Sequence, residues 1–233
     1  MPNALRFKFS REEKLKYIAH LDILRLFERA LKRSGLPVAY TQGFNPRQKL
    51  VFGLPISIGL TSSGEYADIE FDQDVSIMEF IERLNKNLPD GIKILDAVPL
   101  SGKDRVMSQI TSARYEISFQ ADKAMSHFAI DSIVRDFLNK EEIMVMKKTK
   151  KGMKPVNIKP LIYSLSAGKS GLDGYVLEAF LSAGPENNLR PDLLMEAFIE
   201  GTGLSLSIES VHRVELYASL LNEWKSPFEV ANG

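Results

Sequence analysis

The sequence contains no cysteine among its 233 residues. This absence excludes disulfide bonds, cysteine nucleophiles, iron–sulfur clusters and cysteine-ligated zinc from the chemistry of the chain. Histidine is also scarce: His20, His127 and His212 are far apart and match no metal-ligand spacing. We therefore expect no metal site and no cofactor.

The chain also lacks a net charge and a long apolar run. Thirty Lys and Arg residues balance thirty Asp and Glu residues, so only local charge can point to a class of partner. No apolar stretch reaches the roughly 18 residues of a membrane span, and charged residues occupy the place where a secretory signal peptide needs an apolar segment. We expect a cytoplasmic protein that makes no contact with a membrane.

What the sequence does contain is a repeated order of elements. Leu5, Phe7 and Phe9 alternate with polar residues, which indicates a strand, and apolar residues at helical spacing between Ile23 and Leu31 predict an amphipathic helix. Two further strands, a second helix and a last strand complete the order βαββαβ by residue 98. From Tyr115 the same order recurs with one extra strand, and residues 204–217 form either a strand pair or one long bent strand.

This order is that of the split-βαβ, ferredoxin-like motif. We predict an α+β protein with tandem ferredoxin-like (βαββαβ) domains at residues 1–103 and 112–220, followed by a loose tail at residues 221–233. Each domain would have one antiparallel sheet with its helices on one face. The alternative is one larger α+β domain in which the strands of both halves mix.

Local charge is concentrated in the first sixty residues, where eleven Lys and Arg face four Asp and Glu. Four of these cations lie on the predicted helix opposite its apolar stripe: Arg25, Arg29, Lys32 and Arg33. They fit a phosphate-binding surface, or a solvated helix end at which cations favour the helix dipole.

The segment that follows this helix combines the residue types that single-stranded RNA recognition uses. Aromatic rings can stack on bases, side-chain amides can bind base edges, and cations can bind phosphates; the residues are Tyr40, Gln42, Phe44, Asn45, Arg47, Gln48 and Lys49. The alternative is a structural loop whose aromatic residues fill the core. We expect a split, in which Phe44 packs while Tyr40, Gln42 and Arg47 face a groove beside the basic helix.

A second basic segment lies between residues 140 and 160, with seven lysines and two glutamates. Lys148 and Lys151 are its candidate phosphate ligands, in a hairpin that would bind RNA without reading its sequence. A solvated hairpin tip is the alternative.

His20 is the single candidate catalytic residue, as a general acid–base, because an unperturbed histidine has a pKa of about 6.5. A structural histidine near a helix start is the competing interpretation. Glu65, Asp68 and Glu70 resemble a carboxylate cluster, and Asp68 and Glu70 share one strand face, although an exposed strand face is favoured over a magnesium site. The chain has no phosphate-binding glycine loop, dinucleotide fingerprint or serine elbow.

Three runs of sequence carry a family resemblance: residues 17–33, 36–50 and 59–70. They resemble the radical-SAM-linked family DUF2344. In that family such a unit stands alone or is joined to the end of a cobalamin-binding radical-SAM protein, so the resemblance implies an accessory role beside such a partner. The chain has no cysteines for a radical-SAM cluster, and it cannot itself be the radical enzyme.

A more distant, fold-level analogy is to the RAMP-type CRISPR RNA-processing proteins, which also pair ferredoxin-like domains. Three functions therefore compete. The leading hypothesis is a cytoplasmic RNA-binding accessory module with no chemistry of its own. The alternatives are a metal-independent ribonuclease that uses His20, and a module that docks a radical-SAM enzyme without contacting nucleic acid.

Overall fold

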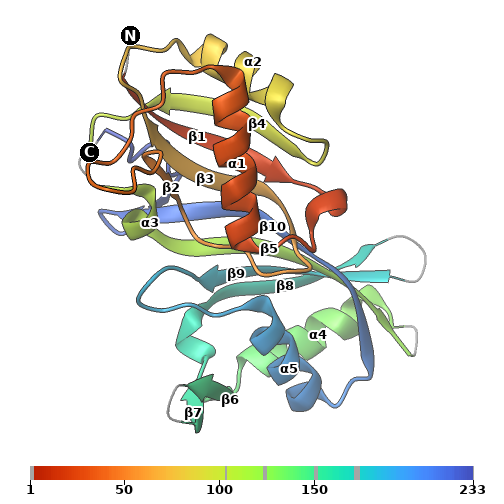
Figure 1. The fold of residues 1–233 in the computed structure, drawn as a ribbon. Helices are drawn as coiled ribbons and strands as arrows, with labels where there is room; N and C mark the ends of the chain where they lie inside the picture. The colour runs from red at the N-terminus through yellow and green to blue at the C-terminus, as the bar shows by residue number, and fades with distance from the viewer. Residues whose placement is uncertain (1–2, 103, 123–124, 150–151, 171–173, 233) are drawn as a thin grey trace. The chain divides into compact units, whose positions relative to one another are not determined.

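The structure is a computed structural model that describes residues 3–102, 104–122, 125–149, 152–170 and 174–232 (Figure 1). The chain divides into two compact units. Unit 1 comprises residues 1–111 and 215–233, and unit 2 comprises residues 112–214. The chain thus leaves unit 1 once and returns to it.

Unit 1 contains the expected βαββαβ order. Its elements are β1 (Ala4–Arg11), a 3-10 helix (Glu13–Leu15), α1 (His20–Ser34), β2 (Leu50–Phe52), β3 (Thr61–Glu70), α2 (Ile77–Asn87), β4 (Ile92–Pro99), α3 (Val106–Gln109), the end of β10 (Leu206–Leu220) and β11 (Glu223–Lys225). Strand β1 lies between β4 and β3 and is antiparallel to both, and β2 pairs with β3.

The core of unit 1 lies between its sheet and its two long helices. The ring of Phe7 on β1 is 6.0 Å from that of Phe27 on α1 and 5.3 Å from that of Phe80 on α2. Because one strand residue contacts both helices, α1 and α2 cover the same face of this sheet. Helix α1 ends at Gly35, whose φ of 66° is left-handed and therefore favours glycine.

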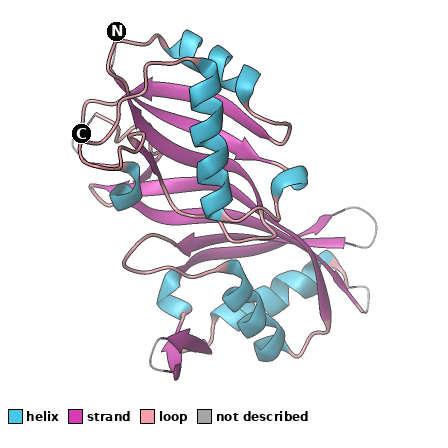
Figure 2. Cartoon of the chain, in the orientation of Figure 1, coloured by secondary structure: helices cyan, strands magenta, loops and turns pink. Residues whose placement is uncertain are grey.

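Unit 2 is built around a second group of antiparallel strands. Its elements are β5 (Ile110–Ala121, from Ser112 onward), α4 (His127–Leu138), β6 (Met144–Thr149), β7 (Gly152–Asn157), a 3-10 helix (Lys159–Leu161), β8 (Ile162–Ser170), β9 (Gly174–Ser182), α5 (Pro191–Thr202) and the start of β10. Strand β9 pairs with β5 and β8, and β6 and β7 form a separate hairpin. Helices α4 and α5 lie together (Figure 2), with the rings of Phe137 and Phe198 5.2 Å apart.

The α+β class is confirmed, but the expected layout of two separate sheets is not. Among the described residues the hydrogen-bonded order is β4-β1-β3-β10-β5-β9-β8, with β2 and β11 added at the side, so a nine-stranded sheet dominates the fold. The two groups of strands share one sheet because β10 is a single strand of 15 residues, not a strand pair. Its residues up to 214 belong to unit 2 and the remainder to unit 1.

The C-terminal residues, which we expected to be loose, are packed within unit 1. Val230 and Ala231 are buried, and the ring of Phe228 lies edge-on to that of Tyr66, with centroids 5.2 Å apart.

No helix in the described part of the chain is both long and apolar enough to cross a membrane.

Candidate nucleic-acid interface

A surface hollow of about 640 Å³ lies between helix α1 and the segment that follows it. We call it the α1 hollow. It is lined by Leu21, Leu24, Arg25, Glu28, Lys32, Tyr40, Asn45, Pro46, Arg47 and Gln48. Six residues that the sequence analysis named for RNA binding are thereby brought together: Arg25, Lys32, Tyr40, Asn45, Arg47 and Gln48.

Helix geometry explains the contribution of α1. Leu21, Arg25, Glu28 and Lys32 follow one another at spacings of three or four residues, so they form a stripe along one side of the helix. The buried face, which includes Phe27, points into the core instead. The same amphipathic pattern that anchors the helix thus presents two cations to the hollow.

Backbone pairing shapes the other wall of the hollow. Tyr40 and Gln48 form an antiparallel bridge, and the amide of Thr41 donates to the carbonyl of Arg47 at 2.8 Å. The amide of Arg47 in turn donates to Thr41 Oγ1 at 3.0 Å. Gly43, with a φ of 121°, allows the turn between the two arms. The segment is therefore a closed loop held mainly by its own backbone.

The bridge also places two side chains of the hollow together. Directly opposed residues of an antiparallel pair lie on the same face, so Tyr40 and Gln48 are neighbours. Lys49 binds Glu70 of β3 at 2.8 Å instead of lining the hollow. Burial acts to raise the pKa of Glu70, but hydrogen bonds from Lys49 and Arg105 hold that pKa below its ordinary value.

Gln48 is the buried polar residue in the lining of the hollow. It is 8% exposed, and its Nε2 donates a long hydrogen bond of 3.5 Å to the Tyr40 hydroxyl. Its Oε1 is buried without a hydrogen-bond partner among the described residues. A buried acceptor left in this way costs about 1–3 kcal/mol.

The hollow carries an excess of positive charge. Arg25 pairs with Asp22 at 3.1 Å, but both side chains are more than half exposed, so this ion pair contributes little and is easily exchanged. Among the described residues, the side chains of Lys32 and Arg47 make no hydrogen bond or ion pair; Arg47 is engaged through its backbone amide. Glu28 is the single carboxylate in the lining.

Other residues of the predicted site lie elsewhere. Arg33 donates to the carbonyl of Asn87 at the end of α2, at 2.6 Å, and Arg29 is exposed outside the lining. Gln42 is exposed on the loop and does not line the hollow. In the second basic segment, Lys151 lies outside the described residues, as does the side chain of Lys148.

The expectation that Phe44 packs is wrong, because this side chain is fully exposed at the loop tip. The loop does not need an apolar anchor, since the backbone pairing of its two arms already fixes it. Tyr40, which is 39% exposed, is the aromatic residue in the lining, and Phe44 is an exposed ring on the same loop outside the lining.

His20 is the first residue of α1 but does not line the hollow. Its ring is edge-on to Phe52, with centroids 5.8 Å apart. Burial lowers the pKa of His20; nearby Glu65 acts to raise it and Arg11 to lower it further. The cavity beside it holds only about 20 Å³, which leaves no room for a nucleotide.

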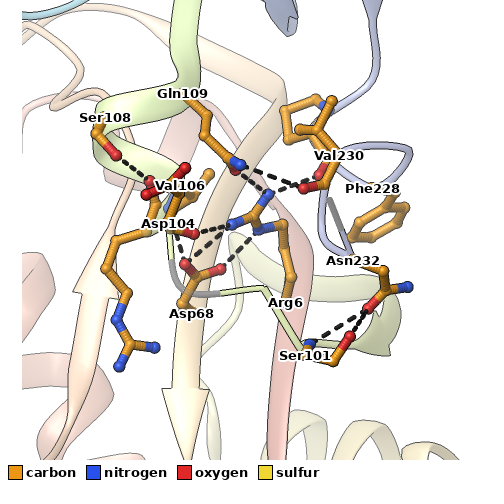
Figure 3. Close-up of polar contacts among 12 residues, drawn as sticks. Arg6, Asp68, Ser101, Asp104, Val106, Ser108, Gln109, Phe228, Val230 and Asn232 are labelled. Carbon is orange, nitrogen blue, oxygen red and sulfur yellow. Dashed lines mark hydrogen bonds and ion pairs between the residues drawn. The ribbon is translucent and has the colours of Figure 1, made fainter. Parts of the chain in front are cut away.

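A buried network that the sequence analysis missed surrounds Asp68 (Figure 3). Its carboxylate binds the guanidinium of Arg6 and accepts a hydrogen bond from the amide of Val106 at 2.8 Å. Asp68 and Glu70 were expected on an exposed strand face, yet both are engaged by arginines. No signal in the sequence pointed to this network, because Arg6 occupies a polar position of the alternating strand, as Lys8 does.

Fold and site together define a mixed α+β protein with a cationic, aromatic hollow beside its first long helix. The chain belongs to DUF2344, a family described as uncharacterized proteins conserved in bacteria, whose model matches residues 4–191. The family resemblance inferred from the sequence is thereby confirmed, and that description mentions no radical-SAM protein.

Comparison with curated protein sequences gives no match. Among solved structures, the chain is similar to one described as the crystal structure of a Cbf5-Nop10-Gar1 complex, with a TM-score of 0.52 and 8% identity over 90% of this chain and 49% of that chain. A structure of an H/ACA RNP bound to a substrate RNA containing 2′-deoxyuridine gives a TM-score of 0.48 and 8% identity, over 90% of this chain and 47% of that one. The chain thus spans about half the length of these structures, and the first likeness is one of fold alone.

Proposed function

We propose that this protein binds single-stranded RNA in the α1 hollow and acts as an accessory module with no chemistry of its own. The observation that carries the proposal is the convergence of Arg25, Lys32 and Arg47 with the partly exposed ring of Tyr40 around one hollow. Neither the helix nor the loop alone has this combination.

Each part of the hollow suits one part of a nucleotide. The cations can bind phosphate oxygens, and the rings of Tyr40 and Phe44 can stack on unpaired bases. A hollow of about 640 Å³ is in the size range of sites that enclose a small ligand. Bases are accessible to such rings only in single strands, because in a duplex their faces are already stacked.

The partner enzyme is a further part of the proposal. The sequence resemblance implies a cobalamin-binding radical-SAM protein, and because this chain has no cysteine, the cluster would belong to that partner. The tandem ferredoxin-like interpretation of residues 1–103 and 112–220, and the cytoplasmic location, likewise remain proposals.

Fluorescence anisotropy with a labelled single-stranded RNA of mixed sequence tests the binding. We expect an affinity that falls with salt, with a logarithmic slope of about −2 if three cations each contact one phosphate. A duplex of the same sequence should bind more weakly. Absence of salt-sensitive binding to the single strand at micromolar protein would contradict the proposal.

The same samples separate binding from cleavage. Denaturing gels after long incubation without magnesium should show intact RNA, because His20 lies outside the hollow. If the RNA is cleaved and His20→Ala abolishes the cleavage, the protein is a ribonuclease and the accessory role is wrong.

A further inference from the structure

We infer that the α1 hollow prefers a guanine base and that Glu28 is the residue that selects it. This inference rests on the proposed RNA binding and adds to it the base that the hollow prefers. Its starting point is a carboxylate in a cationic lining, since Glu28 is the single acidic residue among the described residues that line the hollow.

The carboxylate of Glu28 is available to a ligand. Glu28 lies between Arg25 and Lys32 on the side of α1 that lines the hollow, and it is partly exposed. A glutamate four residues before a lysine is well placed for an ion pair on a helix. In the part of the chain that the structure describes, however, the Glu28 side chain makes no hydrogen bond or ion pair, and Arg25 pairs with Asp22 instead. No internal bond has to be broken before Glu28 engages a ligand.

A carboxylate in this place has a cost for RNA binding. It repels the phosphate groups that the neighbouring cations attract, so Glu28 lowers the affinity for the RNA backbone. The repulsion is offset when the bound nucleotide presents N–H or O–H donors, because a carboxylate carries acceptors alone. Two oxygens side by side are best satisfied by two donors side by side.

Guanine is the base that presents two adjacent donors. Its Watson–Crick edge carries N1–H next to the N2 amine, so both carboxylate oxygens accept a hydrogen bond. On the same edge every other base sets an acceptor beside its donor: N1 in adenine, N3 in cytosine, and O2 and O4 in uracil. That acceptor faces the second carboxylate oxygen and repels it. A group that only accepts therefore distinguishes guanine from the other three bases.

The remaining groups of the lining do not discriminate in this way. The side-chain amides of Asn45 and Gln48 carry a donor and an acceptor, which fit an edge of any base. The ring of Tyr40 offers stacking to every base, and the cations bind a backbone that is the same in every sequence. The preference is thus assigned to Glu28.

The experiment measures fluorescence anisotropy at one salt concentration with labelled oligouridine RNAs of about nine residues. The central residue is guanosine, inosine, adenosine or uridine. We expect the guanosine RNA to bind about tenfold more tightly than the adenosine RNA. Inosine keeps N1–H but lacks the N2 amine, so the inosine RNA should bind with an intermediate affinity.

Glu28→Gln keeps the length of the side chain and removes its charge. The amide presents a donor beside an acceptor, so the preference for guanosine should fall to less than about twofold. The affinity for oligouridine should rise, because the repulsion of phosphate is lost. A purely electrostatic role of Glu28 would instead raise all affinities alike and keep the preference. As a control, Glu82→Gln makes the same change at an exposed position of α2 outside the hollow and should keep the preference.

Circular dichroism and thermal melting verify that the variants are folded, and Glu28→Ala serves as a second variant that should also lose the preference. Equal binding of the guanosine and adenosine RNAs by the native protein would overturn the inference while the proposed function stands. A preference that survives both Glu28 variants would overturn it too. Equal losses of affinity for all four RNAs in both variants would assign Glu28 to a ribose hydroxyl and likewise overturn it. If none of the RNAs binds, the proposed function itself fails.

Discussion

Asp68 of β3 binds the guanidinium of Arg6 of β1 through both of its carboxylate oxygens. The distances are 2.7 Å from Nε to Oδ1 and 3.1 Å from Nη2 to Oδ2, and both side chains are within 1% of complete burial. The remaining nitrogen of Arg6, Nη1, donates to Gln109 Oε1 at 2.6 Å and to the carbonyl of Pro227 at 2.8 Å. One buried cation thus joins two strands to the C-terminal segment.

Replacing Asp68 should destabilise the protein strongly. Asp68→Asn leaves the charge of Arg6 buried without its counter-ion, and we expect the free energy of unfolding to fall by about 3–5 kcal/mol. Urea denaturation measures this value. As a control, Asp90→Ala breaks an exposed ion pair with Lys14 and should cost less than about 1 kcal/mol. Equal costs at the two positions would contradict this account.

Removing residues 227–233 should also destabilise the protein. The truncation removes the carbonyl of Pro227 from Arg6 and exposes the core positions that Phe228 and Val230 cover. We expect the melting temperature to fall by about 5–10 °C, as for a loss of a few kcal/mol in a protein of this size. An unchanged melting temperature would show that the segment is loose after all.

Arg47→Ala should weaken RNA binding without affecting stability. The side chain is exposed and lines the α1 hollow, so its loss removes one phosphate contact. We expect the magnitude of the salt slope to fall by about 0.7 for a single-stranded RNA. Lys93→Ala, an equally exposed cation on β4 away from this hollow, should leave the slope unchanged.

Phe44→Ala should separate binding from folding. Because the ring is fully exposed, its loss should change the free energy of unfolding by less than about 0.5 kcal/mol, yet weaken RNA binding by about 1–3 kcal/mol through lost stacking. Phe27→Ala is the contrast: this ring is completely buried and its removal should cost about 3–5 kcal/mol of stability. Unaltered binding by the Phe44 variant would exclude this ring from the site.

His20 should make the protein less stable in mild acid. Burial lowers its pKa below the ordinary 6.5 in the folded state, so the unfolded state binds more protons as the pH falls from 6.5. The free energy of unfolding therefore decreases as the pH falls through that lowered value, and His20→Gln should reduce the decrease. Urea denaturation at pH 7.5 and 5.0 measures both effects, and NMR titration of the His20 ring should show a midpoint below 6.5.

Local patterns predicted the elements of this fold well, and for a physical reason. The alternation of Leu5, Phe7 and Phe9 and the helical spacing from Ile23 to Leu31 reflect which side chains each element buries, so both appear where expected. The pairing of strands could not be predicted in this way, because it depends on contacts between residues far apart in the chain. Periodicity left open whether residues 204–217 form one strand or a pair, and it could not give the strand order of the nine-stranded sheet.

The sequence likewise predicted some features of the α1 hollow and not others. Helical spacing placed Arg25 and Lys32 on one side of α1, and composition marked the loop that supplies Tyr40 and Arg47. What composition could not show is the Tyr40–Gln48 bridge, or that Lys49 binds Glu70 instead of lining the hollow. Nor could it show that backbone pairing makes an apolar anchor at the loop tip unnecessary.

The division of β10 between the two units has a consequence for synthesis on the ribosome. Unit 2 is one uninterrupted stretch, residues 112–214, and is entirely synthesised before Glu215 appears. Unit 1, although it contains the N-terminus, must wait for residues 215–233 before its sheet and the surroundings of Arg6 are complete. Domains usually fold in the order in which they are synthesised, but here unit 2 can finish first, and unit 1 remains incomplete until residues 215–233 emerge.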